Sequence, residues 1–303
     1  MTLLRLAHLS DPHLSVPLAD VPVSAWLGKR ALSRLSWVRG RGALQQPGVL
    51  AAAVADIQAH QPDHWAITGD VTNFSLPVEF RAAASWLASL DAPARVSVIP
   101  GNHDALVPLP QAEGWAHWQP WMQGDAPDDR ALPWLRVRQG VALLGLSSAL
   151  PTPPGIAGGT LGAAQLQWLA AQLAATGAQG LFRIVLLHHP PADGVVSARK
   201  ALTDRAALRA VLAEHGAELV LHGHSRDARF DPLRGPQGLI ASFGLPSISA
   251  IPNPRDEGSR WHLLTIEKTT QGWQLGVTVR VLDAAAMCFV TAAQYALQVP
   301  PSR

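Results

Sequence analysis

Histidine, aspartate and asparagine side chains recur in this chain directly after short apolar segments. The densest group follows residues 96–99, where a Pro-Gly breaker leads into Asn102, His103 and Asp104. An amide, an imidazole and a carboxylate in succession could bind a metal ion or move a proton, although Gly-Asn is also a common turn. Four other apolar segments end similarly, leading to Asp11-Pro12-His13, Gly69-Asp70, His188-His189-Pro190 and His222-Gly223-His224.

Two of these strand ends carry residue types with clear metal chemistry. Asp11 and His13 can offer an oxygen and a nitrogen to one ion, although this pattern alone is better explained as a turn aspartate beside a surface histidine. Asp70 directly follows a strand and a glycine, which leaves its carboxylate free to bridge two cations. Cys288 is the only cysteine, so a metal site must be built from carboxylates and the 12 histidines.

The elements that carry these groups alternate along the chain. Strands are predicted at 3–9, 64–68, 95–99, 141–146, 183–187 and 218–221, with helices at 49–60, from Pro77, after Thr160 and at 204–215. This order predicts a parallel sheet of βαβ units, in which functional groups gather at the carboxyl ends of the strands.

The last part of the chain is rich in predicted strands. They lie at 239–243, 247–250, 262–267 and 273–282, and they predict a second, largely antiparallel sheet packed on the first. No repeat or low-complexity linker divides the chain. We therefore assign residues 1–283 to one domain and residues 284–303 to a C-terminal tail or short helix.

Composition narrows the class of protein. With 303 residues, 48% of them hydrophobic and 15% charged, the chain can bury a sizeable core and does not have the composition of a disordered protein. The formal net charge of +2 does not favour a nucleic-acid partner. No apolar run approaches the ~18 residues of a membrane helix, and the N-terminus lacks the pattern of a signal peptide. We therefore expect a cytoplasmic protein.

Residues 14–48 are an irregular basic insert. The insert carries Lys29, Arg30, Arg34, Arg39 and Arg41, with Trp26 and Trp37 among them. One interpretation is a basic cap that reaches over the site and holds a phosphorylated substrate or an anionic surface. The other, which composition alone favours, is a solvated amphipathic hairpin that only covers the domain.

The ordered series of motifs resembles the calcineurin-like metallophosphoesterase superfamily. Asp-x-His, Gly-Asp, Gly-Asn-His-Asp, a strand-terminal His and Gly-His occur in this order, and the resemblance covers about residues 3–282. It is closest to the bacterial single-domain phosphodiesterases and phosphatases. The resemblance implies an α/β fold, a four-layer αββα sandwich of two mixed sheets flanked by helices.

The resemblance also implies a site with two metal ions, Mn, Fe or Zn. It assigns Asp11 and His13 to the first ion and makes Asp70 the bridge between both. The second ion would be completed by Asn102, His188 and His224.

His103 is implied as the group that protonates or stabilises the leaving alkoxide, with Asp104 orienting its other ring nitrogen. His189 and His222 are interpreted as packing residues or as residues behind the ligands.

One position departs from the family pattern of Gly-His-x-His. The second histidine is replaced by Arg226, and a guanidinium cannot ligate a metal, so the first ion should bind weakly or not at all. Three interpretations remain open: Arg226 places a catalytic positive charge on the phosphate, a shifted turn brings in Asp227 as a ligand, or the site is degenerate and the protein is a non-catalytic interaction scaffold. The surviving ligands favour an enzyme.

These observations predict a metal-dependent hydrolase of phosphate mono- or diesters that uses in-line attack by metal-bound hydroxide. The substrate would be a small phosphate ester, and a cyclic nucleotide is the sharpest hypothesis. A nucleotide-lipid pyrophosphohydrolase is an alternative. A nuclease is disfavoured because it would need a basic track along the nucleic-acid backbone.

Overall fold

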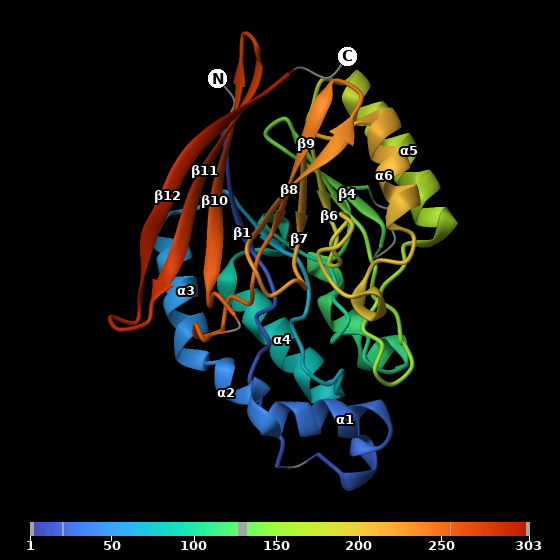
Figure 1. The fold of residues 1–303 in the computed structure, drawn as a ribbon, viewed down its shortest axis with the longest axis vertical. Coiled ribbons are helices and arrows are strands. Elements are labelled where there is room, and N and C mark those ends of the chain that lie inside the picture. The colour runs from blue at the N-terminus through green and yellow to red at the C-terminus, as the bar shows by residue number, and fades with distance from the viewer. Residues whose placement is uncertain (1–2, 20, 127–131, 255, 301–303) are drawn as a thin grey trace.

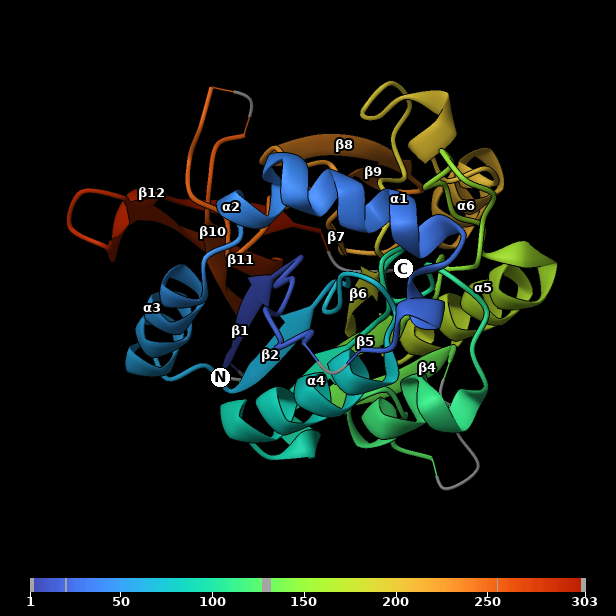
Figure 2. The same ribbon diagram turned by 90° about the horizontal axis from the view of Figure 1, so that it is seen from below.

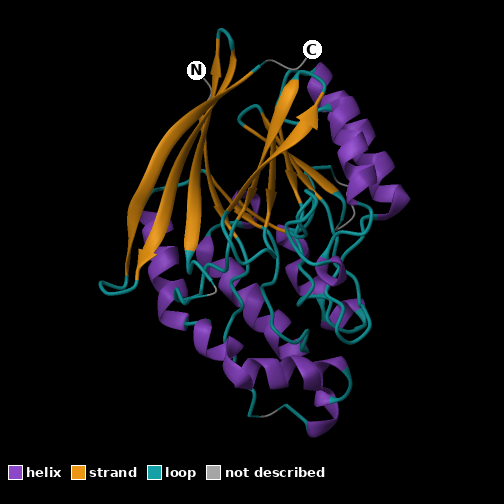
Figure 3. Ribbon diagram, viewed as in Figure 1, coloured by secondary structure: helices purple, strands orange, loops and turns teal. Residues whose placement is uncertain are grey.

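Two mixed six-stranded sheets face each other in the middle of the molecule (Figure 1, Figure 3). The structure is a computed structural model, and it describes residues 3–19, 21–126, 132–254 and 256–300. The first sheet has the order β12-β11-β10-β1-β2-β3, with β1 at Leu3–Leu9, β2 at His64–Ile67, β3 at Val96–Val98, β10 at Arg260–Thr269, β11 at Gly272–Asp283 and β12 at Cys288–Val299. The second has the order β4-β5-β6-β7-β9-β8, with β4 at Trp134–Arg138, β5 at Val141–Gly145, β6 at Phe182–Leu186, β7 at Leu219–His222, β8 at Arg229–Gly235 and β9 at Gly238–Gly244.

Helices cover the outer face of each sheet. The first sheet carries α3 (Pro47–Ala59) and α4 (Pro77–Leu90), and the second carries α5 (Gly162–Ala178) and α6 (Arg205–His215). Three apolar cores therefore lie between four layers, which confirms the αββα sandwich. None of the described helices is long and apolar enough to span a membrane, and the cytoplasmic location stays a prediction.

Alternation along the strands explains the layering. In β1, Leu4 and Leu6 belong to the core between the sheets, whereas Ala7 and Leu9 belong to the core under α3 and α4. Successive side chains of a strand point to opposite faces, so a strand that is apolar at nearly every position is buried on both sides.

The strands predicted after residue 238 are divided between the two sheets, whereas the sequence predicted that they form a sheet of their own. Strands β10 and β11 extend the first sheet by antiparallel pairing on β1, and β9 joins the second sheet parallel to β7. They do not form a separate antiparallel sheet, and residues 247–250 form no strand. Sequence patterns identified most of these strands but not their partners, because pairing depends on contacts far apart in the chain.

The prediction of a C-terminal tail or short helix is wrong for residues 288–299. These residues form β12, which pairs along β11 at the edge of the first sheet. Only Phe289 of this strand is buried. An edge strand that is mostly exposed lacks the apolar alternation by which strands are recognised.

The basic insert is helical and lies across the strand-end edge of the sheets (Figure 2). It contains α1 (Lys29–Ser36), a kinked turn at Trp37–Arg41 and α2 (Gly42–Leu44). Trp26 and Trp37 both make edge contacts with Phe74, at ring-centroid distances of 5.2 and 5.7 Å. The Arg30 guanidinium donates to the carbonyls of Phe74 and Ser75. These contacts fix the insert to the loop that follows β2.

Candidate metal centre

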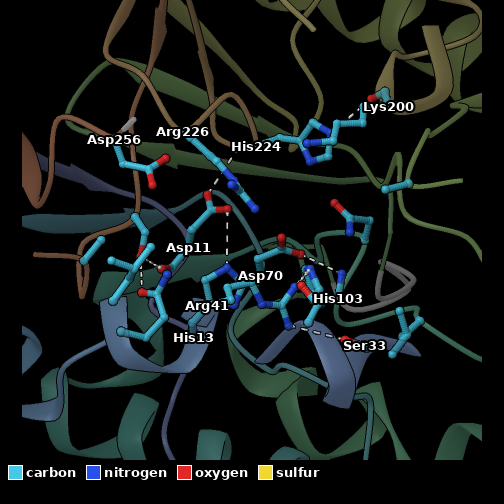
Figure 4. A pocket seen from close by; sticks show the side chains of 18 of the residues that line it. Asp11, His13, Ser33, Arg41, Asp70, His103, Lys200, His224, Arg226 and Asp256 are labelled. Atoms are coloured by element: carbon cyan, nitrogen blue, oxygen red, sulfur yellow. Dashed lines mark hydrogen bonds and ion pairs between the residues drawn. The ribbon is translucent and has the colours of Figure 1, made fainter. Parts of the chain in front are cut away.

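The polar segments that follow β1, β2, β3, β6 and β7 meet at one edge of the two sheets (Figure 4). Parallel pairing of β1 with β2, of β2 with β3 and of β6 with β7 brings their carboxyl ends together. A pocket of about 380 Å³ opens there. Seven predicted site residues line it: Asp11, His13, Asp70, Asn102, His103, His224 and Arg226. His188 is buried against Asp70, and Asp104 is buried under the loops.

Several candidate ligands occupy strained backbone positions at this edge. Asp11, His13, Asp70 and His224 all have positive φ, between 43° and 67°. Such values are uncommon for residues other than glycine, and they cluster at functional sites. Two glycines let the backbone pass close to the candidate carboxylate ligands. A Cβ on Gly101 would overlap Asp70 Oδ1, and a Cβ on Gly223 would overlap Asp11 Oδ2.

Two groups of donor atoms share the Asp70 carboxylate. Asp11, His13 and Asp70 form one group, and Asp70, His188 and His224 form the other. Within each group the ligand atoms all lie within 4.8 Å of one another. All five residues are among those that the family resemblance assigns to the two ions, and Asp70 is the residue it assigns to both.

Hydrogen bonds orient the three candidate histidine ligands. Each ring donates one N–H to a backbone carbonyl: Nδ1 of His13 to Thr72 at 3.4 Å, Nδ1 of His188 to Thr68 at 2.7 Å, and Nε2 of His224 to Lys200 at 3.0 Å. The other nitrogen of each ring is therefore available as a ligand. Metal-binding histidines are usually oriented in this way.

The surroundings of His188 fit a bound cation. Its Nε2 lies 3.3 Å from Asp70 Oδ2 and 3.3 Å from Asn102 Oδ1, so three acceptor atoms converge when the ring is neutral. Burial disfavours the charged ring, but the Asp70 carboxylate outweighs burial and raises the pKa of His188 to about 10. A proton on the His188 ring supplies, beside Asp70, the positive charge that a bound metal ion would otherwise supply. Oxygen and nitrogen donors of this kind suit Mn, Fe or Zn.

Asp104 does not orient the His103 ring, so this part of the prediction is wrong. Its carboxylate accepts hydrogen bonds from the backbone N–H groups of Gly101, Val71 and Thr72 and from the Thr72 hydroxyl, at 2.7–3.2 Å. Asp104 therefore ties the loop after β3 to the loop after β2. The three N–H groups are backbone donors that would otherwise be buried without partners.

His103 is held by two other groups. Its Nδ1 donates to the Asn73 carbonyl at 2.9 Å, and its Nε2 accepts a hydrogen bond from Nη1 of Arg41 at 2.8 Å. Burial, and then the charge of Arg41, holds the pKa of His103 well below its usual range. The ring is therefore neutral, and the insert reaches the centre of the pocket.

Sequence reasoning missed the position of Arg41. Of the basic residues in the insert, only Lys29 and Arg41 line the pocket. Arg30 binds the loop after β2, and the Arg34 guanidinium lies over the Trp26 ring at 4.5 Å. The only signal was the basic composition of the insert, which does not show which side chain enters the pocket.

Arg226 lines the pocket with a backbone φ of 67°, and its side chain is drawn above Asp11 in Figure 4. Asp227 belongs to neither donor group among the described residues, so the shifted-turn interpretation gains no support. His189 is satisfied by the Ser148 hydroxyl and the Ala157 carbonyl, and His222 is buried beside the Gly223 carbonyl. Neither has an atom in the donor groups.

Comparison with known proteins agrees with this geometry. The family model of the calcineurin-like phosphoesterases matches residues 4–226. The chain belongs to the calcineurin-like phosphoesterase family. Membership confirms the predicted class, a metallophosphoesterase.

Two similar proteins of this family are bacterial. A cAMP/cGMP dual specificity phosphodiesterase of Mycobacterium tuberculosis is 29% identical over 168 residues, 54% of this chain and 48% of the mycobacterial protein. The match therefore spans about half the length of that relative. A probable cyclic nucleotide phosphodiesterase of Synechococcus is 28% identical over 230 residues, 75% of this chain and 80% of the other.

A solved structure shares the fold. A dimetal phosphatase from Danio rerio superposes with a TM-score of 0.55 at 13% identity, covering 95% of this calcineurin-like phosphoesterase and 98% of the other chain. At that identity the likeness shows the fold alone.

Proposed function

We propose that this chain hydrolyses a phosphodiester bond in a small, nucleotide-like substrate with the help of two divalent metal ions. The observation that carries the proposal is the pair of donor groups that share Asp70, with each histidine ring already oriented by a backbone carbonyl. The two cyclic-nucleotide phosphodiesterase relatives favour a cyclic nucleotide as the first substrate to test.

The candidate ligands divide into two sets with different numbers of protein ligands. Asp70, Asn102, His188 and His224 would hold one ion, and Asp11, His13 and Asp70 would hold the other with one ligand fewer. Ions held there would polarise the phosphoryl oxygens and lower the pKa of a water molecule. The half that lacks a fourth protein ligand is the one that Arg226 borders, so we expect weaker affinity there.

The chain's own groups would act on the phosphoryl charge. Arg226 faces the pocket from the strand end after β7 and would stabilise negative charge that develops on the phosphoryl oxygens. His103, beside the shared Asp70, would face the leaving oxygen once the substrate displaces Arg41 from Nε2.

The experiment measures metal content per chain and the hydrolysis of bis-p-nitrophenyl phosphate, p-nitrophenyl phosphate and cyclic AMP with added Mn. We expect turnover of the diesters and tighter binding of one ion than of the other. Arg226→His should strengthen the weaker ion by at least about tenfold, because it restores a ligand.

A second candidate function is a non-catalytic interaction scaffold, which the replacement of a ligand by Arg226 favours. If the wild type hydrolyses none of the three esters with Mn bound while Arg226→His does, the native site is degenerate and the scaffold is the correct reading. Turnover by the wild type excludes the scaffold.

A further inference from the structure

Arg41 is a largely buried cation with only neutral hydrogen-bond partners. Its Nη1 donates to His103 at 2.8 Å and its Nη2 to the Ser33 hydroxyl at 3.3 Å, whereas its buried Nε has no partner among the described residues. No described carboxylate lies within ion-pair distance of it. Asp70 and Glu79 act on it only from beyond that distance. A buried charge without a direct ion pair is costly, so this guanidinium can gain from binding an anion.

A second arginine shares the pocket with Arg41, and its charge acts on Arg41. Arg226 lines the same pocket and has no hydrogen bond or ion pair with another described residue. Burial lowers the pKa of Arg41 to about 10; the Asp70 carboxylate opposes this shift, and the positive charge of Arg226 adds to it. Two cations that disfavour each other without an anion between them are both stabilised when an anion binds.

The pocket as a whole carries more positive charge than a single phosphodiester needs. Among the described residues, five basic side chains line it: Lys29, Arg41, Arg199, Lys200 and Arg226. Three carboxylates line it as well, but Asp11 and Asp70 belong to the donor groups, and Asp256 is bonded to the Asn253 amide at 3.0 Å. Metal ions on the donor groups would already neutralise the phosphate that is cleaved.

We propose that Arg41 and Arg226 form a binding site for a second phosphate group of the substrate, next to the phosphate that is hydrolysed. The inference rests on the proposed function and names a substrate class for it: nucleotides with two phosphates rather than monoanionic cyclic nucleotides. Arginine suits this task because its planar guanidinium binds phosphate oxygens in a bidentate manner. The pocket volume of about 380 Å³ is in the range of small-molecule sites.

The two phosphates could be adjacent, as in a pyrophosphate link, or separated on one ribose. Both arrangements offer the same chemistry to the arginines, so the experiment includes a ligand of each kind. ADP-ribose has adjacent phosphates, adenosine 3′,5′-bisphosphate has separated ones, and cyclic AMP has a single phosphate with the same base and ribose.

The test measures binding of these three ligands to the Mn-loaded protein by calorimetry, together with competition against bis-p-nitrophenyl phosphate hydrolysis. In the wild type, at least one two-phosphate ligand should bind tighter than cyclic AMP by about tenfold or more. A tenfold difference in affinity is what about one charge-assisted hydrogen bond contributes. Arg226→Ala should weaken both kinds of ligand, because Arg226 is also proposed to act on the phosphate that is hydrolysed. Arg41→Ala should abolish the preference for two phosphates and leave the affinity for cyclic AMP nearly unchanged. Arg41→Lys should recover part of it.

Arg34→Ala is the matched control, because Arg34 belongs to the same basic insert but packs on Trp26 outside the pocket. It should keep the wild-type preference. Equal affinity of all three ligands for the wild type, or a preference that survives Arg41→Ala, would overturn the inference. Absence of ester hydrolysis with the binding preference intact would instead overturn the proposed function and leave the phosphate site standing.

A purely structural role of Arg41 is distinguished by thermal unfolding. No described carboxylate lies within ion-pair distance of the buried guanidinium, so Arg41→Ala should leave the melting temperature of the ligand-free protein unchanged or higher. It should also remove the extra stabilisation that the two-phosphate ligand gives. A lower melting temperature with equal loss of affinity for all ligands would assign Arg41 to the fold and contradict the site.

Discussion

Arg41 Nη1 lies 2.8 Å from His103 Nε2 and joins the insert to the strand-end loop that also carries Asn102. With Nδ1 donating to the Asn73 carbonyl, the neutral ring has its only lone pair directed at the guanidinium. In this arrangement His103 cannot donate a proton through Nε2. Substrate must separate the two side chains, and Nε2 must take up a proton from solvent, before His103 can protonate a leaving oxygen.

His103→Ala therefore tests the leaving-group role. The variant should keep its metal content and lose about 100-fold in kcat, with the largest loss for esters of poorly acidic alcohols. A series of aryl and alkyl phosphodiesters of increasing leaving-group pKa measures this dependence. The same loss for every leaving group would show that His103 does not act on the leaving oxygen and only holds Arg41 in position.

Asp104→Ala should destabilise the fold through the two strand-end loops. The change leaves three buried backbone N–H groups, those of Gly101, Val71 and Thr72, without an acceptor. We expect a loss of about 3 kcal/mol in the free energy of unfolding, measured by urea denaturation. Asp104→Asn keeps an oxygen acceptor and should lose less. A loss below ~1 kcal/mol for the alanine variant would contradict the assigned role.

Gly223→Ala should weaken the first donor group without removing a ligand. A Cβ at this position would overlap Ser10 Oγ and Asp11 Oδ2, so the Asp11 carboxylate must shift. We expect one metal ion fewer per chain in equilibrium dialysis against Mn. Gly48→Ala is the control, because a Cβ there meets nothing within 4 Å and φ is not positive. If the wild type and Gly48→Ala bind two ions and Gly223→Ala binds two as well, Asp11 is not a ligand.

The candidate ligands could be predicted from the sequence because each follows a buried strand directly. Asp11, Asp70 and His188 occupy positions that the parallel topology brings together, and the family resemblance then assigned them to the two ions. Arg41 could not be placed in this way. It lies after a kink at Gly40, whose φ is 142°, and its contact with His103 spans 62 residues.

The role of Asp104 was mistaken for a related reason. The family resemblance implied that it orients His103, but the two side chains of a tight turn point to different partners. Asp104 faces backbone N–H groups of its own loop and the neighbouring one, and His103 faces the Asn73 carbonyl. Motif spacing identifies which residues gather, while their hydrogen-bond partners depend on the three-dimensional turn.

The buried His262 makes the stability of the protein dependent on pH. Neither ring nitrogen has a hydrogen-bond partner among the described residues, and the ring packs between Phe243 and His8. Burial, and then the charge of Arg260, lowers its pKa to about 3. Since the unfolded chain binds this proton near pH 6.5, stability is present above that pH and falls as pH drops toward 3, by about 3 kcal/mol at pH 4. Urea denaturation from pH 7 to 4 should show a smaller loss for His262→Leu than for the wild type. An unchanged pH dependence would mean that other buried histidines, such as His8, dominate it.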